Sequence, residues 1–191
     1  MKKPLSTEIR ILTETAVLLA VAVVLDALAG LYSPFRYGGS ISPAMLPIFI
    51  LAVRHGWKRG LAAGFLFGVL QSLVGMALGN FYFLSLAQYA LDYLVAFTVL
   101  GVAGIFPKAL KNPWALAGGI LFASFLRYLA HGFSGVVFWA EYATVPNVWF
   151  YSFVLYNLPY MAASAALCLV LGLILQERGL LAWGLEESSK G

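Results

Sequence analysis

The stretch TETAVLLAVAVVLDAL, residues 13–28, decides the class of fold to which this chain belongs. Its only charged side chains are Glu14 and Asp26, and apolar residues continue on both sides, from about residue 9 to residue 31. About 20 apolar residues in an α-helix are enough to cross the hydrocarbon core of a bilayer. The stretch therefore predicts a membrane-spanning helix. Ala27-Leu28-Ala29 resembles a signal-peptidase site, but the two charges argue against cleavage, and we expect the helix to be retained.

The composition of the whole chain also indicates a membrane protein. Of 191 residues, 62% are hydrophobic and 10% are charged, whereas soluble domains have roughly 45–50% apolar and about 25% charged residues. A soluble fold of this length could not bury so much apolar surface, so lipid must cover part of it. The net charge of +4 does not indicate nucleic-acid binding, because the basic residues form short clusters between apolar runs. The single cysteine, Cys168, cannot form an internal disulfide and has no metal ligands near it in the sequence.

We predict an all-α integral membrane protein, a bundle of six transmembrane helices that forms one membrane domain over residues 1–191. The connecting loops are short, so consecutive helices should be antiparallel neighbours. The sequence has no Gly-rich phosphate-binding loop with its lysine, so this chain should not power ATP-driven transport alone. The apolar stretches place the helices at about residues 9–31, 42–53, 60–78, 83–106, 113–140 and 148–175.

The basic residues indicate the orientation of these helices. With the N-terminus in the cytoplasm, ten of the twelve Lys and Arg residues fall in cytoplasmic segments, whereas Arg36 lies outside and Arg127 lies within a span. Cytoplasmic loops of membrane proteins carry such an excess of basic residues. We therefore predict that both termini are cytoplasmic. The ten residues are Lys2, Lys3, Arg10, Arg54, Lys58, Arg59, Lys108, Lys111, Arg178 and Lys190.

The helix expected at residues 60–78 carries glycines four residues apart. They begin with Gly60, Gly64 and Gly68, and Gly75 and Gly79 follow further on. Glycines at that spacing line one face of a helix and let another helix approach closely. Tight packing within the chain is the favoured interpretation, and an external docking face is the alternative.

Polar side chains within the expected spans mark the candidate functional site, because such residues are costly in lipid and usually face the interior of a bundle. On the fifth helix, Arg127, His131, Gly135 and Trp139 are four residues apart and form one stripe. The stripe offers a cation, an imidazole, a gap without a side chain and a large flat ring. It suits a flat heterocyclic ligand that stacks on Trp139 while the backbone at Gly135 approaches it closely.

The fourth and sixth helices should complete a cavity near the outer surface. The fourth contributes Gln88 and Asp92, four residues apart, with Tyr93 beside them. An aromatic-lined cavity with a carboxylate, an imidazole and an amide suits a small organic cation with a hydrogen-bonding ring. The sixth helix contributes Trp149, Phe150, Tyr151, Ser152, Tyr156, Asn157 and Tyr160.

Other interpretations of these residues remain open. Arg127 and Asp92 could neutralise each other as a structural ion pair. Asp26 could cap or pair near the outer end of the first helix without touching a ligand. The aromatic residues that could instead belong to the belt at the membrane interface are Trp149, Phe150 and Tyr142.

Metal binding and catalysis are not expected. Only His55 could join His131 as a metal ligand, and His55 lies at the cytoplasmic side, so we expect no metal. A membrane protease would need a Ser/His pair, two facing aspartates or a His-Glu-x-x-His motif. Asp26 and Asp92 could be offered as a dyad, but nothing around them supports it. We therefore expect no catalytic residues and no enzyme activity.

Five stretches, which together cover nearly the whole chain, follow in order the pattern of one known family. They are TETAVLLAVAVVLDAL in the first helix, SISPAMLPIFILAVRHGWKRGLAAGFLFGVLQSLVGMA through the second and third, SLAQYALDYLVAFTVLGVAGIF in the fourth, RYLAHGFSGVVFWAEYA in the fifth and YSFVLYN in the sixth. These stretches resemble the thiamine-specific S-components of energy-coupling factor (ECF) vitamin transporters, the ThiT family.

The resemblance implies a six-helix S-component fold and a high-affinity thiamine receptor with its pocket near the outer surface. In the family, a carboxylate and an amide contact the edge of the aminopyrimidine, and aromatic rings stack on both rings of thiamine. The spacing in the sixth helix leaves open whether Tyr151 or Ser152 faces the ligand, and Tyr37 is a candidate for an aromatic residue from the loop after the first helix. The implied substrate-binding residues are Asp92, Tyr93, Arg127, His131, Gly135, Trp139, Tyr151 and Asn157.

The resemblance also implies partners. Ala16 and Ala20 match the small-residue motif of the family's first helix, the surface that meets the transmembrane coupling subunit, which works with two ATPase subunits. We expect thiamine as the ligand, no cofactor, no nucleic acid, and a multi-pass location in a bacterial cell membrane. The alternatives are an S-component for another vitamin or heterocycle, and a self-sufficient secondary transporter.

Overall fold

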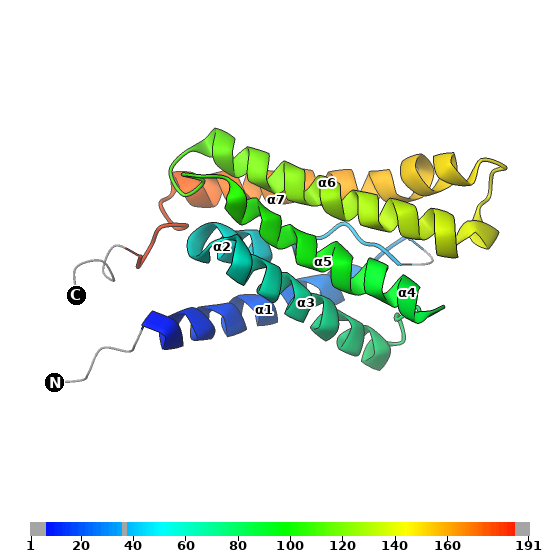
Figure 1. Cartoon of the computed structure of the whole chain (residues 1–191), viewed down its shortest axis with the longest axis horizontal. Helices are drawn as coiled ribbons and strands as arrows, with labels where there is room; N and C mark the ends of the chain where they lie inside the picture. The colour runs from blue at the N-terminus through cyan, green and yellow to red at the C-terminus, as the bar shows by residue number, and fades with distance from the viewer. Residues whose placement is uncertain (1–6, 36–37, 186–191) are drawn as a thin grey trace.

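The computed structural model describes residues 7–35 and 38–185, and this part of the chain is helical with no β-strand (Figure 1). The long helices lie roughly along one axis, so that α1 begins at the end of the bundle where the chain leaves α7. The elements are α1 (Thr7–Leu31), α2 (Leu46–His55), α3 (Trp57–Leu78), the rod Leu86–Ile105 with α4 (Leu86–Tyr89) and α5 (Ala96–Thr98), α6 (Pro113–Phe138), and the rod Phe150–Glu177, which ends with α7 (Leu158–Glu177).

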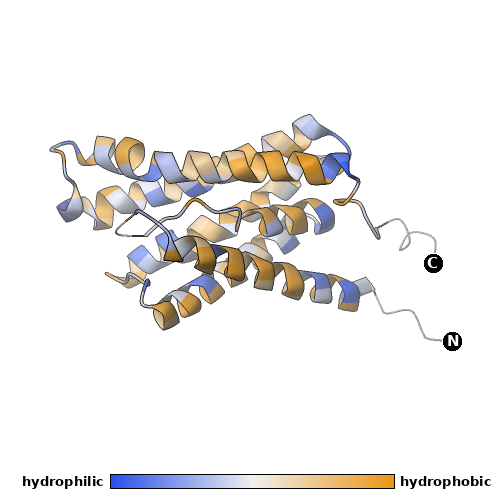
Figure 2. Cartoon of the chain, turned by 180° about the vertical axis from the view of Figure 1, so that it is seen from behind, coloured by the Kyte–Doolittle hydropathy of each residue, from blue (hydrophilic) through white to orange (hydrophobic). Residues whose placement is uncertain are grey.

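Five of these helices are long and apolar enough to cross a membrane: α1, α3, α6 and the two rods. Their bounds differ from the spans expected from the sequence by at most three residues at either end. α1 has a mean hydropathy of 2.2 over its most apolar window, yet only 11% of that window is buried inside the protein. Figure 2 shows this helix hydrophobic over most of its length, with hydrophilic residues near its N-terminal end. Its outer surface must therefore be covered by lipid or by another protein.

The second crossing differs from the expected helix at residues 42–53. α2 begins only at Leu46 and has 10 residues, so it rises about 15 Å, half of a bilayer core. Two prolines explain the late start: Pro43 disfavours helix at the residue before it, and Pro47 suits the first turn of a helix. The preceding segment lies inside the protein, where the N–H of Ser42 donates to Ser164 Oγ (3.0 Å). Irregular backbone at membrane depth requires such internal partners.

Two helices contain π-helical segments, Ala90–Val95 within the fourth crossing and Phe150–Asn157 within the last. A π-helix aligns residues five apart instead of three or four, and such turns are frequent at functional sites. Asp92 and Tyr93 lie on the first segment, and Tyr151 lies on the second. The two segments therefore position residues that the sequence indicated as ligand contacts.

The glycines of α3 pack within the chain, as the favoured interpretation had it. A Cβ built on Gly64 would overlap the carbonyl oxygen of Phe97, and one on Gly68 would overlap that of Tyr93. The two helices touch through their backbones, so the rod that carries Asp92 is held directly against α3. Gly79 has a different role, since it ends α3 in the left-handed conformation (φ +74°).

Arg54 joins three parts of the chain at the end where α1 begins. Its guanidinium pairs with Glu14 on α1 (2.5 Å) and donates to the carbonyl oxygens of Leu181 (2.6 Å) and Trp183 (3.2 Å), in the segment after α7. The beginning of α1 and the segment after α7 therefore lie on the same side of the bundle. That this side is cytoplasmic rests on the charge bias of the sequence and stays a prediction.

Replacing Gly64 by alanine should weaken the contact between α3 and the rod that carries Asp92. The added methyl overlaps a backbone oxygen that cannot rotate away, and overpacking typically costs about 1–3 kcal/mol. Ala62→Val is the matched control, because Ala62 lies on the exposed face of the same helix. Thermal unfolding of the purified protein in detergent should give a lower Tm for Gly64→Ala than for Ala62→Val. Equal Tm values would mean that the contact is looser than the structure has it.

Candidate ligand-binding site

A cavity of about 350 Å³ lies towards the end of the bundle opposite the beginning of α1. Its wall includes the last turn of α1, the loops that follow α1 and α3, and the segment that follows α6. All eight residues that the sequence indicated as ligand contacts line this cavity: Asp92, Tyr93, Arg127, His131, Gly135, Trp139, Tyr151 and Asn157. Three crossings of the chain, remote from one another in sequence, therefore bring these residues together.

Asp92 is the centre of a hydrogen-bond network in this cavity. Its Oδ2 accepts from Gln88 Nε2 (2.8 Å) and from Trp139 Nε1 (3.2 Å), and its Oδ1 lies 3.2 Å from His131 Nδ1. A carboxylate has about four lone-pair positions, and donors of the chain occupy at least three of them. The bond from the indole also fixes the plane of Trp139, so the carboxylate positions the largest ring of the cavity.

His131 connects Asp92 to Arg127. Arg127 Nε donates to His131 Nε2 (3.3 Å), so Nε2 acts as an acceptor and carries no proton. Nδ1 then carries the proton and donates to Asp92. Both contacts require the neutral tautomer of the imidazole. The ion pair considered between Arg127 and Asp92 does not occur within the described residues; instead the guanidinium lies over the ring of Phe97, 4.3 Å from its centroid.

The π-helical segment of the last crossing resolves the spacing of Tyr151, Ser152 and Asn157. Ser152 and Asn157 are five residues apart and face one another, with Asn157 Nδ2 donating to the Ser152 carbonyl oxygen (2.9 Å). Tyr151 and Tyr156, also five apart, have ring centroids 5.9 Å apart. Both pairs line the cavity. The Ser152 hydroxyl donates to the Gly132 carbonyl oxygen (2.7 Å), so Ser152 holds two helices together while Tyr151 presents a ring.

Gly135 has a different neighbour from the one expected. A Cβ built on Gly135 would lie 2.9 Å from the Cβ of Ser152 and would overlap its hydroxyl. The missing side chain therefore allows the last crossing to approach α6 closely. Ser152 fills the direction in which a side chain at Gly135 would point, while Gly135 itself still lines the cavity.

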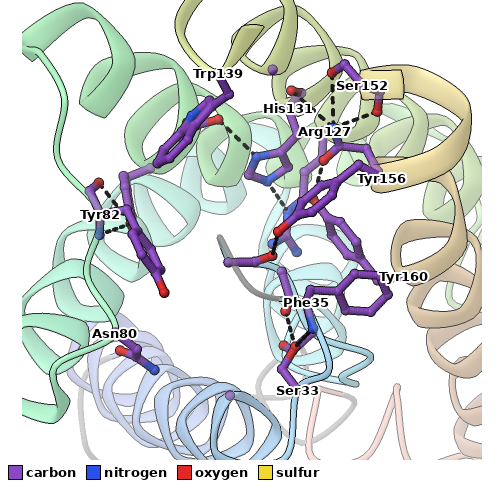
Figure 3. A pocket seen from close by; sticks show the side chains of 18 of the residues that line it. Ser33, Phe35, Asn80, Tyr82, Arg127, His131, Trp139, Ser152, Tyr156 and Tyr160 are labelled. Atoms are coloured by element: carbon purple, nitrogen blue, oxygen red, sulfur yellow. Dashed lines mark hydrogen bonds and ion pairs between the residues drawn. The ribbon is translucent and has the colours of Figure 1, made fainter. Parts of the chain in front are cut away.

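Aromatic rings form two facing walls of the cavity. Figure 3 shows Tyr82 and Trp139 along one side and Phe35, Tyr156 and Tyr160 along the other. Tyr82 and Trp139 are edge-to-face with centroids 6.0 Å apart, and Phe35 meets Tyr160 at 5.1 Å. Ring faces carry partial negative charge and attract cations, and a slot between rings accepts a flat ligand.

Several lining residues lie outside the set that the sequence indicated. The loop after α1 contributes side chains and backbone, and the Tyr156 hydroxyl donates to the Gly38 carbonyl oxygen in this loop (2.9 Å). The Tyr93 hydroxyl bonds the backbone of Tyr82 and so holds the loop after α3. Tyr37 lies outside the described residues. The further lining residues include Asp26, Gly30, Ser33, Phe35, Gly38, Gly39, Ser40, Gln71, Asn80, Tyr82 and Tyr142.

A sequence signal existed for two of these residues. Asp26 and Gln71 are polar residues within expected spans, and such residues usually face an interior cavity. Tyr142, considered for the membrane interface, also lines the cavity. Loop residues such as Asn80 gave no signal, because a loop position does not reveal what it covers. Within residues 7–35 and 38–185, no cluster of three or more His, Cys, Asp or Glu side chains could hold a metal ion.

The fold and the cavity define a class: a membrane-embedded binding protein with a buried, aromatic-walled pocket for a small organic ligand. The sequence profile of the thiamine transporter protein family (Thia_YuaJ) matches residues 12–181. The chain belongs to this family, and it is a multi-pass membrane protein of a transporter family rather than an enzyme.

Individual relatives agree with this assignment. The thiamine transporter ThiT of Bacillus subtilis (strain 168) is 35% identical over 170 residues, which cover 83% of this chain and 86% of the relative. ThiT of Lacticaseibacillus paracasei is 32% identical over 180 residues, 86% of each chain. A solved structure of ThiT from Listeria monocytogenes has the same fold, with a TM-score of 0.76, 24% identity, and coverage of 91% of this chain and 96% of that one.

The contact between Gly135 and Ser152 can be tested by a double-mutant cycle. Gly135→Ala should lower the Tm of the purified protein, because its methyl overlaps the Ser152 side chain. Ser152→Gly should also lower the Tm, because it removes the hydrogen bond to Gly132. In the double variant, the space left by Ser152 should accept the methyl, so the combined loss should be smaller than the sum of the two. Additive losses would place the two residues apart.

Proposed function

We propose that this chain binds thiamine in the cavity described above. The observation that carries the proposal is the largely buried carboxylate of Asp92, held beside His131 and Trp139 in a cavity with two aromatic walls. Thiamine joins an aminopyrimidine, which is a flat hydrogen-bonding ring, to a positively charged thiazolium ring. The cavity of about 350 Å³ lies within the range of roughly 300–1,000 Å³ usual for small-molecule pockets. The relatives in Bacillus subtilis and Lacticaseibacillus paracasei are named thiamine transporters.

The chemistry of the two walls agrees with this ligand. The carboxylate of Asp92 suits the exocyclic amino group of the pyrimidine, which donates hydrogen bonds. Trp139 and the tyrosines offer ring faces to the cationic thiazolium. Helices and the loop after α1 surround much of the cavity, so these contacts are less exposed to water, and therefore stronger, than at a surface.

We propose further that the chain acts as the substrate-capture subunit (S-component) of an ECF-type importer. In this role it takes up thiamine at the outer surface and delivers it inward after docking with a transmembrane coupling subunit and two ATPase subunits. Ala16 and Ala20 support the proposal, because both are exposed on α1, the helix with the least buried span window of the five. Small residues on an exposed helix face allow a second helix to pack closely within a membrane.

The binding proposal predicts that Asp92→Ala and Trp139→Ala each weaken thiamine binding by about tenfold or more, since a lost stacking or buried polar contact costs about 1–3 kcal/mol. Trp139→Phe keeps a ring but loses the bond to Asp92, so it should fall between Trp139→Ala and the wild-type protein. The control is Trp114→Ala, because Trp114 is 85% exposed at the first turn of α6, remote from the cavity.

Titration of the purified protein, followed by quenching of its tryptophan fluorescence, measures these affinities. Riboflavin and biotin serve as competing heterocycles. Unchanged thiamine affinity in both alanine variants would refute the proposed pocket. Tighter binding of riboflavin or biotin than of thiamine would assign the cavity to another ligand.

The docking proposal predicts that Ala16→Trp and Ala20→Trp abolish thiamine uptake by cells that express the complete transporter, while the purified variants bind thiamine normally. The large ring should prevent close approach of a partner helix without touching the cavity. Val21→Trp is the matched control, because Val21 is also exposed on α1 but about a third of a turn away from Ala20. Loss of thiamine binding in Ala16→Trp or Ala20→Trp would instead make this face part of the core. Uptake by the isolated chain in liposomes would favour a self-sufficient secondary transporter.

A further inference from the structure

The charged groups that the described residues present to the cavity are unequal in number. Among the described lining residues, the side chains that can carry charge are Asp26, Asp92, Arg127 and His131. His131 is neutral, because its Nε2 accepts a hydrogen bond from Arg127 and its Nδ1 donates to Asp92. When both carboxyl groups are ionised, they face one guanidinium, which leaves a surplus of one negative charge. A buried charge without a partner is costly, so such a site either keeps one carboxyl group protonated or is completed by a ligand of opposite charge.

The two carboxylates differ in how well the chain satisfies them. Asp92 has three hydrogen-bond donors of its own chain. Asp26 forms no ion pair within the part of the chain that the structure describes. Its neighbours in the cavity are the amide of Gln71, which reaches it from α3, and the charge of Arg127. Gln71 Oε1 is itself buried and has no hydrogen-bond partner among the described residues. This side of the cavity thus has acceptor capacity that the described chain does not use.

The two carboxylates lie on different helices of the cavity wall. Asp26 is on α1, which packs against α2 and α3, whereas Asp92 is on the rod Leu86–Ile105, which packs against α3 and α6. An elongated ligand can therefore contact both at once, with a hydrogen-bonding group at Asp92 and a positive charge at Asp26. The aromatic walls of the cavity accommodate flat rings.

We propose that Asp26 is the counter-charge for the cationic ring of the ligand and that it makes the site select an elongated monocation over a neutral molecule of the same shape. This inference rests on the proposed function, since it takes thiamine as the ligand. Asp92 recognises the aminopyrimidine end, which is neutral, and Asp26 recognises the thiazolium end. Asp92 thus recognises the hydrogen-bonding pattern of the ligand, and Asp26 recognises its positive charge.

The test compares thiamine with a neutral analogue in which thiophene replaces the thiazolium ring. Both compounds keep the aminopyrimidine, the side chain and the overall shape, so they differ mainly in charge. The purified full chain should bind thiamine about tenfold or more tightly than the analogue, because a buried charge pair contributes at least that factor. Asp26→Asn should lose most of this preference: the affinity for thiamine falls by about tenfold, while that for the analogue stays within about threefold. Retained binding of the analogue also proves that the variant is folded.

Asp92→Asn is the matched control, since it removes the same charge at the other end of the cavity. It should weaken both compounds together and keep most of the preference for thiamine, because both present the same aminopyrimidine. Asp26→Glu, which keeps the charge, should keep most of the preference as well.

Each other outcome overturns the inference. Equal loss of both compounds in Asp26→Asn would make Asp26 a structural or hydrogen-bonding group, and no loss would place it outside recognition. A preference that falls as much in Asp92→Asn as in Asp26→Asn would assign charge selection to the cavity as a whole. If Asp26→Asn does not fold, equal affinities of the wild-type protein for the two compounds still refute the inference. Failure of the wild-type protein to bind either compound would refute the proposed function, and the inference with it.

Discussion

A carboxylate buried among lipid-facing helices needs hydrogen-bond donors, and in this protein the rest of the cavity depends on how Asp92 obtains them. Its donors come from its own helix and from α6, namely Gln88, His131 and Trp139. Because each donor is held by the same acceptor, the orientation of the imidazole and that of the indole are coupled. His131 in turn is held by Arg127. The network therefore fixes a ring, a neutral imidazole and a cation in one arrangement before any ligand enters.

Departures from regular α-helix make this arrangement possible. An α-helix brings residues three or four apart to one face, but Ser152 and Asn157 are five apart, and the π-helical segment Phe150–Asn157 aligns them. The same segment packs closely on Gly135 of α6. On the other side, the backbones of α3 and the rod with Asp92 touch at Gly64 and Gly68. Close packing at small residues thus supports the helices whose irregular turns face the cavity.

The sequence predicts regular features well and irregular ones poorly. Long apolar runs fixed the positions of five crossings to within three residues, because length and hydropathy alone determine a membrane span. Four-residue spacing identified the stripe from Arg127 to Trp139, since Arg127 to Gly135 lie on regular α-helix and Trp139 directly follows the end of α6. The late start of α2 has a local cause in Pro43 and Pro47. The π-helical segments instead depend on contacts between distant parts of the chain, so no local pattern shows them. Gly135 was placed on the correct face, but the close approach of Ser152 to it was not foreseen, because that approach depends on the π-helical segment of another crossing.

α1 combines two surfaces with opposite requirements. Leu19, Ala22 and Asp26 follow the spacing of three and four residues that marks one face of a helix; the first two are buried in the protein, and Asp26 lines the cavity. Val17, Val21 and Val24 lie exposed on another face, where lipid is the natural solvent. Asp26 lies on the inner face of a helix that otherwise faces lipid. Its carboxylate is tolerated there only where a neighbouring cation and polar groups offset its loss of hydration. Arg127 supplies part of that compensation. An organic cation between the aromatic walls would supply the remainder, so ligand binding would also stabilise the carboxylate on the inner face of α1.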